Sequence, residues 1–383
     1  MKNFILIMFL TFVNNILGQN KIEGQIISDN NEILPFSNIR LKQSSIGTYS
    51  NSEGKFILNF DEIHLKDTLV VSHIGFNDYE NILKTILENN TVNFKLQESS
   101  IELDEIILEN INSKEISKNA FSKLNTNHLP QNYDVFFRSY ESKDGVWRGF
   151  IEASLLVENA KLSFEKENIS IYVKEIRKSK DLFKSSNTKV SPYSNFKYLL
   201  LFNPNRCNYS FKGVVKQNGR DIYQISFISN NNVFEGNLFI DKKTHGFYKI
   251  AYKGTEKSNS KYRKRENEIN GEKVKTYLTY GKWEVEMTFR NKKEKFEFES
   301  IKYSITRNTF NRKNKSTPLF VHNIIAESYF SESTGKPKDK SLLSPGKNIY
   351  ELEKTYDPAF WEKYNAVIRD SLQASIINLL EEK

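Results

Sequence analysis

The chain has almost no cysteine. Cys207 is the single one among 383 residues, so no disulfide can form within the chain, even in an oxidising compartment. The fold must therefore be held by its core alone. We interpret Cys207 as a partly buried structural thiol, with a nucleophilic cysteine as the alternative.

The chain also lacks apolar runs that suit an ordinary transmembrane helix. Residues 4–13 form a short apolar run after Lys2, which is too short to cross a bilayer. Small Gly18 follows, and the pattern predicts a signal peptide over residues 1–18 with cleavage after Gly18. We expect an exported protein, periplasmic or associated with the outer membrane. No cysteine follows directly, so a lipoprotein anchor is not indicated.

Charge of one sign is not in large excess. The sequence has 56 Lys and Arg against 47 Asp and Glu, a formal net charge of +9. This mixed surface argues against a nucleic-acid partner. Hydrophobic residues make up 38% and aromatic residues 13%, enough for packed cores, and the length suits two or three domains.

Signatures of catalysis are missing too. None of the five histidines begins a His-x-x-Glu pair, and no Gly-x-Ser-x-Gly or phosphate-binding Gly-Lys loop occurs. Glu284 and Glu286 share a strand face, which we interpret as solvated. We therefore predict no catalytic residue, no metal ligand and no cofactor, with an enzyme whose site escapes recognition as an alternative.

What the sequence does contain is a series of short strands over residues 21–97. Alternating apolar residues and regular turn signals predict a small β-sandwich. In residues 47–60, GTYSNSEGKFILNF, we predict a hairpin in which Gly54 adopts a positive φ. Phe56, Leu58 and Phe60 are expected on its buried face.

A set of glycines, turn residues and apolar residues recurs at characteristic spacings over residues 21–97, namely Gly24, Pro35, Gly47, Thr48, Gly54, Lys55, Phe56, Ser72, Ile74, Gly75 and Phe76. With this set, residues 21–97 resemble the carboxypeptidase-like regulatory domain, a transthyretin-like β-sandwich. Asn51 and His73 depart from the family, which often has Asp and Tyr there, and neither should disturb the fold. The resemblance implies an accessory module without peptidase activity.

Residues 103–107, LDEII, resemble the Leu-Asp-Glu-Val run that follows this domain in TonB-dependent outer-membrane transporters. The resemblance implies an energy-coupling box and an accessory role in uptake. We favour an edge strand and linker instead, because the remaining chain is several hundred residues too short for a plug and a transporter barrel.

The larger part of the chain is predicted to be a second β domain. We expect a linker and helix over residues 98–129, with Ile116, Ala120 and Leu124 on one helical face, and an antiparallel sheet or half-barrel over residues 130–355. Within it, VKTYLTYG and KWEVEMTFR are expected as two separate strands that meet at Gly281. FEGNLFIDKKTHGFYKIAYKG resembles the strands of lipoprotein-carrier sheets, which implies an apolar concavity. The basic run at residues 261–265 is predicted as a solvated hairpin tip, with contact to anionic headgroups as the alternative.

Residues 356–383 predict one amphipathic helix, whose apolar stripe is expected to include Leu372, Ile376 and Leu379. Asp357 suits its N-cap and Pro358 its first turn. We favour docking of this helix on the sheet of the second domain, and the alternative is contact with a partner. Phe360, Trp361 and Tyr364 are the candidate binding or docking residues.

Together these features predict a mainly β protein, in which a transthyretin-like sandwich precedes a larger antiparallel domain. We expect a non-catalytic envelope protein whose partner is an envelope protein, a lipid or a glycan, with peripheral outer-membrane association. Lipid or lipoprotein handling by a curved apolar sheet is an alternative. The sequence does not indicate the oligomeric state.

Overall fold

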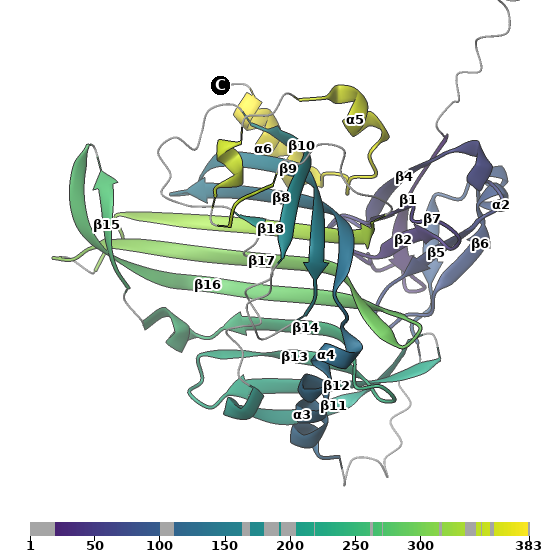
Figure 1. Cartoon of the computed structure of the whole chain (residues 1–383), viewed down its shortest axis with the longest axis horizontal. Helices are drawn as coiled ribbons and strands as arrows, with labels where there is room; N and C mark the ends of the chain where they lie inside the picture. Colours follow the sequence, from purple (N-terminus) through teal and green to yellow (C-terminus); the bar gives the residue numbers. More distant parts are fainter. Residues whose placement is uncertain are drawn as a thin grey trace, which may run out of the picture. The chain divides into compact units, whose positions relative to one another are not determined.

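The protein is mainly β, and its chain divides into two compact units (Figure 1). Unit 1 takes the chain up to His73, Asp78–Gln97 and Pro358–Ile368, and unit 2 takes Ile74–Asn77, Glu98–Asp357 and Arg369 onward. The computed structural model describes residues 20–99, 111–162, 169–179, 191–192, 204–217, 219–260, 263–269, 271–313, 316–333, 342–345, 347–352 and 356–381. The predicted signal peptide and residues 103–107 lie outside these ranges and stay predictions.

Unit 1 is a β-sandwich of two sheets. One sheet has the order β4-β1-β7 and the other β3-β2-β5-β6, so the predicted sandwich is confirmed. The elements are β1 (Asn20–Ser28), β2 (Asn38–Leu41), β3 (Gly47–Tyr49), β4 (Lys55–Phe60), β5 (Thr68–Ser72), β6 (Tyr79–Ile82), α2 (Leu83–Glu88) and β7 (Asn93–Leu96).

The stretch at residues 47–60 is not the predicted hairpin. β3 pairs with β2, whereas β4 pairs with β1 in the other sheet, so the turn carries the chain from sheet to sheet. Alternation shows which face of a strand is buried but not which strand it pairs with. Gly54 does adopt a positive φ, of 72°. The Asn51 side-chain oxygen accepts hydrogen bonds from the N–H groups of Glu53 and Lys55, as the carboxylate of an aspartate would.

Unit 2 is built on one antiparallel sheet of eleven strands. Ten follow the order β10-β9-β8-β18-β17-β16-β14-β13-β12-β11, and β15 pairs with β16. The strands are β8 (Gln131–Lys143), β9 (Val146–Ala160), β10 (Ser170–Lys178), β11 (Cys207–Gln217), β12 (Arg220–Ser229), β13 (Phe234–Asp241), β14 (Phe247–Gly254), β15 (Arg263–Ile269), β16 (Glu272–Lys292), β17 (Lys295–Asn311) and β18 (Phe320–Glu332). The fold class predicted from the sequence is confirmed.

Two sequence interpretations within unit 2 are wrong. Residues 263–265 belong to strand β15, not to a hairpin tip, and Lys261 and Tyr262 lie outside the described residues. The two strands expected on either side of Gly281 are one strand, β16, whose register shifts between Tyr280 and Trp283. A glycine in a strand marks an irregularity as readily as an end.

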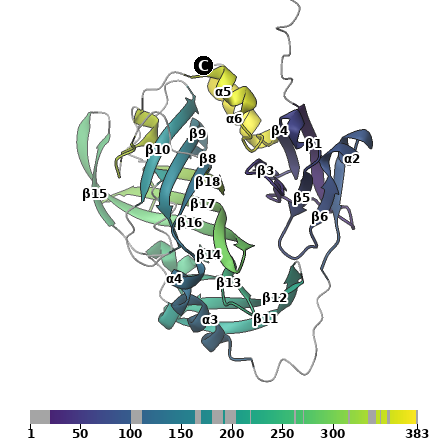
Figure 2. The same cartoon turned by 45° about the vertical axis from the view of Figure 1, so that its right-hand side comes forward.

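The two faces of the unit 2 sheet differ sharply in polarity. Side chains alternate along each strand, so Val135 and Phe137 of β8 point to one face and Arg138 to the other. The first face, here the apolar face, carries a large cluster of buried hydrophobic side chains. Helices α3 (Ser113–Ser122) and α4 (Leu124–Asn127) contact the sheet at β11 and β17 (Figure 2). The opposite face, here the polar face, carries most of the buried charges.

The C-terminal segment holds two helices instead of the single one predicted. α5 (Pro358–Lys363) groups with unit 1, and α6 (Ser371–Glu381) contacts β9 of unit 2 (Figure 1). The break has a local cause, because Asp370 caps α6. Its carboxylate accepts from Gln373 N–H at 2.8 Å, and the Gln373 side chain accepts from Asp370 N–H at 3.2 Å. This reciprocal capping box starts a new helix.

The break also changes which apolar residues are buried. Leu372 and Leu379, expected on the buried stripe, are each 51% exposed, whereas Ile377 and Leu380 are buried. In the part of the chain that the structure describes, no helix is long and apolar enough to cross a membrane.

Candidate functional site

Five aromatic side chains from five neighbouring strands form a continuous row on the apolar face. We call this set the aromatic row. Successive ring centroids lie 6.3, 6.3, 6.3 and 5.8 Å apart, which is within the range of favourable ring contacts. Its members, in order across β11, β12, β13, β14 and β16, are Tyr209, Phe227, Phe234, Tyr252 and Trp283.

Two glycines make room for these rings. Gly236 lies between Phe227 and Tyr252, its partners on the two neighbouring strands. Because glycine has no side chain, the neighbouring rings occupy the space above it. A Cβ on Gly236 would lie 2.1 Å from the Ala251 carbonyl oxygen, and a Cβ on Gly254 would lie 2.2 Å from the Trp283 Nε1. Larger residues at either position would displace the backbone or the indole.

Buried and partly exposed rings alternate along the row. Phe227 and Tyr252 are 3% and 4% exposed, whereas Tyr209, Phe234 and Trp283 are only partly buried. Burial raises the pKa of Tyr252 well above its ordinary value, so the surroundings are apolar. The Tyr209 hydroxyl donates to the Pro204 carbonyl at 2.8 Å.

Such a row can bind but has no means of acid–base chemistry. Its phenols stay protonated at neutral pH, since burial also raises the pKa of Tyr209. Flat, partly exposed rings offer large apolar contact areas to a ligand. The nearest thiol, Cys207, has its pKa raised to about 11 by burial, which suits the structural role predicted for it.

The polar face carries a second row, made of alternating charges. Arg177, Glu152, Arg138, Glu327, Lys302 and Glu286 are direct cross-strand partners over β10, β9, β8, β18, β17 and β16. We call this set the charged row. Because like charges opposite one another destabilise a sheet, the strict alternation of sign favours this register.

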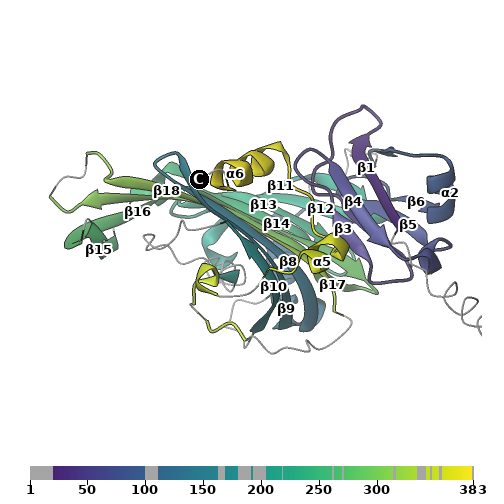
Figure 3. The same ribbon diagram turned by 90° about the horizontal axis from the view of Figure 1, so that it is seen from above.

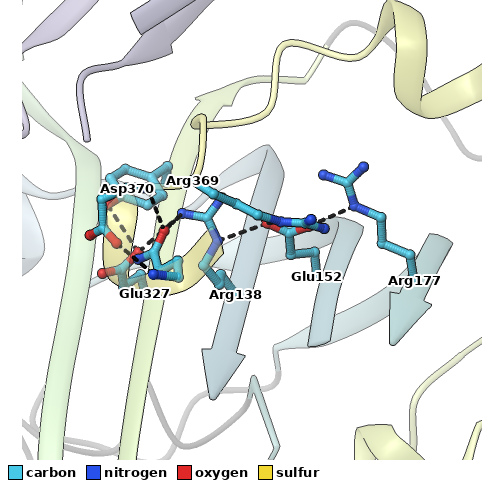
Figure 4. Close-up of polar contacts among 8 residues, drawn as sticks. Arg138, Glu152, Arg177, Glu327, Arg369 and Asp370 are labelled. Atoms are coloured by element: carbon cyan, nitrogen blue, oxygen red, sulfur yellow. Dashed lines mark hydrogen bonds and ion pairs between the residues drawn. The ribbon is translucent and has the colours of Figure 1, made fainter. Parts of the chain in front are cut away.

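Within the charged row, Glu152 is paired with three arginines (Figure 4). Its carboxylate lies 2.7 Å from an Arg138 nitrogen, 2.6 Å from Arg177 and 2.8 Å from Arg369. Burial alone would raise the pKa of Glu152, but these three guanidinium groups outweigh it and lower the pKa to about 2. The carboxylate therefore stays ionised at neutral pH and is unsuited to general acid catalysis.

Helix α6 is fixed to the same row. The Arg138 Nη1 donates to the Gln373 side-chain oxygen at 2.7 Å, which is the oxygen that also accepts from Asp370 N–H. Arg369 adds its ion pair with Glu152. Below the helix, Ile376 and Leu380 pack with Tyr140 and other apolar residues of the sheet. The capping box of α6 and the buried arginine thus stabilise each other.

Lys302 is the unusual cation of the row. Its ammonium nitrogen is shielded from solvent, lies 5.5 Å from the centre of the Tyr329 ring, and is flanked by Glu327 and Glu286. Burial lowers the pKa of Lys302 to about 7, and the two carboxylates only partly offset this. A lysine whose pKa lies near 7 often marks a functional site. The Lys302 side chain, however, lies among the ion pairs that hold the sheet together.

Metal binding has no arranged site in the described ranges, where no group of three or more His, Cys, Asp or Glu side chains could hold a metal ion. His128 is enclosed by rings of Phe247, Phe289 and Phe296. Burial lowers its pKa to about 3, so the imidazole is neutral and belongs to the core.

The three residues predicted as docking residues do come together. Ring centroids of Phe360, Trp361 and Tyr364 lie 5.1 to 5.6 Å from one another. Trp361 is 6% exposed, as expected of a docked indole. The docking predicted for residues 356–383 on the sheet of the second domain holds for α6, which contacts β9, but not for residues 358–368, which group with unit 1. Their role in binding a partner stays a prediction.

Asn365, in the same segment, binds the backbone of β4. Its side-chain oxygen accepts from Asn59 N–H at 2.7 Å, and its amide nitrogen donates to the Asn59 carbonyl at 3.0 Å. β4 is an edge strand. The side chain therefore satisfies edge groups that would otherwise be open to pairing with another strand.

Comparison with known families identifies the N-terminal module. Residues 22–108 match the CarboxypepD_reg-like domain. The CarboxypepD_reg-like domain accounts for the sandwich of unit 1 and confirms the resemblance seen in the sequence, while the sheet of unit 2 lies beyond it. No curated protein matches the chain.

Two solved structures show some likeness to the chain. One is a LolA superfamily protein from Nitrosomonas europaea, with 10% identity and a TM-score of 0.22, covering 60% of this chain and 96% of that one. The other is a DUF1329 family protein from Desulfovibrio piger, with 10% identity and a TM-score of 0.22, covering 59% and 95%. Similarity at this level carries no argument about function.

Proposed function

We propose that unit 2 binds an acyl chain along the aromatic row, and that the protein is a non-catalytic component of the cell envelope. The observation that carries the proposal is the row itself, in which five rings are continuous and three of them are partly exposed on an apolar face. The CarboxypepD_reg-like domain would serve as an accessory module.

The dimensions of the row suit this ligand. Five neighbouring strands span four spacings, or about 19 Å, which is comparable to one leaflet of a bilayer's hydrocarbon core, about 15 Å. Each methylene that leaves water contributes about 0.8 kcal/mol. A chain lying across the rings would therefore gain enough free energy to bind without specific polar contacts.

A glycan fits the row less well. Sugars stack on aromatic rings but also need hydrogen-bond partners beside them, because unpaired hydroxyl groups are costly to desolvate. The Tyr209 hydroxyl is already engaged by Pro204, and Tyr252 lies in apolar surroundings. These features favour an acyl chain, carried either by a free lipid or by a lipid-modified protein.

The non-catalytic part of the proposal is supported by the charged row. Its acidic and basic groups neutralise one another, and the carboxylate of Glu152 is held ionised by three arginines. Groups that act in acid–base catalysis need a pKa near the working pH, and Lys302, the member of the row whose pKa of about 7 meets that condition, has its nitrogen shielded from solvent between Glu327 and Glu286. The envelope location rests on the predicted signal peptide, and N-terminal analysis of the mature protein would test it.

Binding of a fluorescent fatty acid to the purified chain tests the proposal. We expect saturable binding with a change in emission, and competition by unlabelled fatty acid. Trp283→Ala should weaken binding by about tenfold, since it removes ring contacts worth over 1 kcal/mol. Trp147→Ala is the matched control, because Trp147 packs with the α6 cluster on the polar face.

A free lipid and a lipid-modified protein can be distinguished in the same assay. A diacylated peptide that competes much better than a fatty acid favours a lipoprotein ligand, and equal competition favours free lipid. Absence of saturable binding, or equal losses in Trp283→Ala and Trp147→Ala, would contradict the proposal.

A further inference from the structure

One end of the unit 2 sheet gathers the ends of three adjacent strands. Lys143, at the end of β8, pairs with Val146 at the start of β9 and with His322 near the start of β18. His322 in turn pairs with Arg307 of β17. The β8–β9 turn and the β17–β18 connection therefore lie at the same end of the sheet, which we call the basic end (Figures 1 and 3).

Apolar side chains are exposed at this end. Val146 is 43% exposed and Leu319 44% exposed, and both lie at turns, where a membrane surface could reach them. β9 and β18 are two strands apart, so these two side chains are separated by about 10 Å across the sheet.

The backbone holds these tips in place. Asp144 N–H donates to the Val321 carbonyl at 2.8 Å, and Val321 N–H donates to the Asp144 carboxylate at 2.8 Å. Leu319 N–H donates to the Thr309 carbonyl at 2.6 Å. The two connections are thus tied to neighbouring strands, so the apolar tips are presented without a large cost in conformational entropy on binding.

Basic residues surround the tips. The described residues 305–313 and 316–320 contain three cations, Arg307, Arg312 and Lys313, and no Asp or Glu. Arg148 and Lys313 are exposed, and the Lys143 ammonium lies 4.6 Å above the Phe320 ring.

Acidic residues at this end are few. Asp144 lies in the β8–β9 turn, and its carboxylate accepts a hydrogen bond from Val321 N–H. The adjoining β15–β16 hairpin is mixed in charge, since Lys273 and Lys275 are accompanied by Glu266 and Glu272. The excess of positive charge therefore lies at the β8–β9 and β17–β18 connections.

We propose that the basic end of unit 2 docks on an anionic lipid surface. Exposed Lys and Arg attract anionic headgroups, and this attraction falls with salt, while apolar tips enter the interfacial layer. The aromatic row ends nearby, because Trp283 pairs with Ile305, two residues before Arg307. The docking surface would bring an acyl-chain site to its source, but it uses different residues and stands even if the row binds no lipid.

Vesicle flotation with the full mature chain tests this proposal. We expect the protein to float with vesicles of phosphatidylglycerol and phosphatidylethanolamine, not with phosphatidylcholine vesicles, and to be released at about 0.5 M salt. The double variant Arg148→Glu/Lys313→Glu should lower the bound fraction about tenfold, and Val146→Ser/Leu319→Ser should also lower it.

Matched controls come from the opposite end of the same strands. Leu129, which precedes β8, is 42% exposed, and Lys293 is exposed in the β16–β17 turn. Leu129→Ser and Lys293→Glu should leave vesicle binding unchanged. Since all these positions are exposed, melting temperatures should not change, which excludes misfolding as a cause.

Three outcomes would contradict the proposal that the basic end docks on an anionic lipid surface. They are equal binding to anionic and zwitterionic vesicles, unchanged binding by both double variants, and equal losses in the controls. Its failure is distinguishable from failure of the acyl-chain site. The basic-end variants should still bind a fluorescent fatty acid without vesicles, and Trp283→Ala should still float with anionic vesicles.

Discussion

Arg138 and Glu152 face each other across β8 and β9, 2.7 Å apart, with side chains 1% and 0% exposed. Removing two charges from water is costly, and the cost is recovered only if both are paired and hydrogen-bonded. Here Arg177, Arg369 and Gln373 complete the network. The pair therefore couples three strands of the sheet to the C-terminal segment.

Arg138→Met should strongly destabilise the protein. It leaves the carboxylate of Glu152 buried beside fewer cations, and breaking a buried pair on one side costs about 3–5 kcal/mol. Urea denaturation measures the change. Lys84→Met is the control, since the Lys84–Glu88 pair is exposed and such pairs contribute at most about 0.5 kcal/mol. Similar midpoints for the two variants would be incompatible with the account.

Glu152 should make the protein sensitive to acid. Its pKa falls from the ordinary 4.5 to about 2 in the folded state, so the unfolded chain takes up the proton first. The stability that Glu152 contributes is full above about pH 4.5 and is lost as pH falls toward 2. Glu152→Gln should flatten the loss of stability in this window, whereas the exposed control Glu88→Gln should not.

Lys302 should make the stability of the protein depend on pH in the alkaline range, between its folded and unfolded pKa values. Its folded pKa of about 7 lies below the ordinary 10.5, so the unfolded chain binds the proton more tightly. Stability should therefore rise as pH increases from about 7 to 10.5, because the cost of burying the ammonium is relieved. Glu327, Glu286, Lys249 and Tyr329 surround it.

Lys302→Met tests this assignment. In the variant, the free energy of unfolding should no longer rise above pH 7. Urea denaturation curves recorded at a series of pH values measure this. A rise of the same size in the variant would assign it to another group and contradict the pKa of Lys302.

Gly54 should tolerate no side chain. It has a φ of 72°, and a Cβ would lie 2.8 Å from the Ile26 carbonyl oxygen and 2.9 Å from Ile33. Gly54→Ala should cost about 1–3 kcal/mol. Gly145 is the matched control, with a φ of 78° and nothing within 4 Å, so Gly145→Ala carries backbone strain alone. Equal losses in thermal stability would show that steric contact at Gly54 is unimportant.

Much of the fold could be predicted from the sequence because it is carried by local signals. Alternating apolar residues show the strands, and glycine and asparagine show the turns, as at Asn51 and Gly54. Pairing partners are not local, so the assignment of β3 and β4 to different sheets was missed. The α6 start had a readable signal in Asp370 and Gln373, three residues apart, which the single-helix prediction passed over.

The candidate site was missed for the same reason. Tyr209, Phe227 and Trp283 are unremarkable as separate aromatic residues on separate strands, and only strand order and register bring them into one row. The alternating signs of Arg138, Glu152 and Glu327 likewise become visible once β8 is paired with β9 and β18. Residue types predicted the strands, whereas the site depends on long-range pairing.

The most direct test of the central claim is quenching of Trp283 by a brominated fatty acid. In the variant Trp147→Phe/Trp361→Phe, Trp283 is the remaining tryptophan of the three in the chain. Bromine quenches an indole only at close range, so a chain bound along the aromatic row should quench Trp283 in a saturable way, and the unbrominated acid should reverse the effect. Saturable binding of the fatty acid with no quenching of Trp283 would contradict the account.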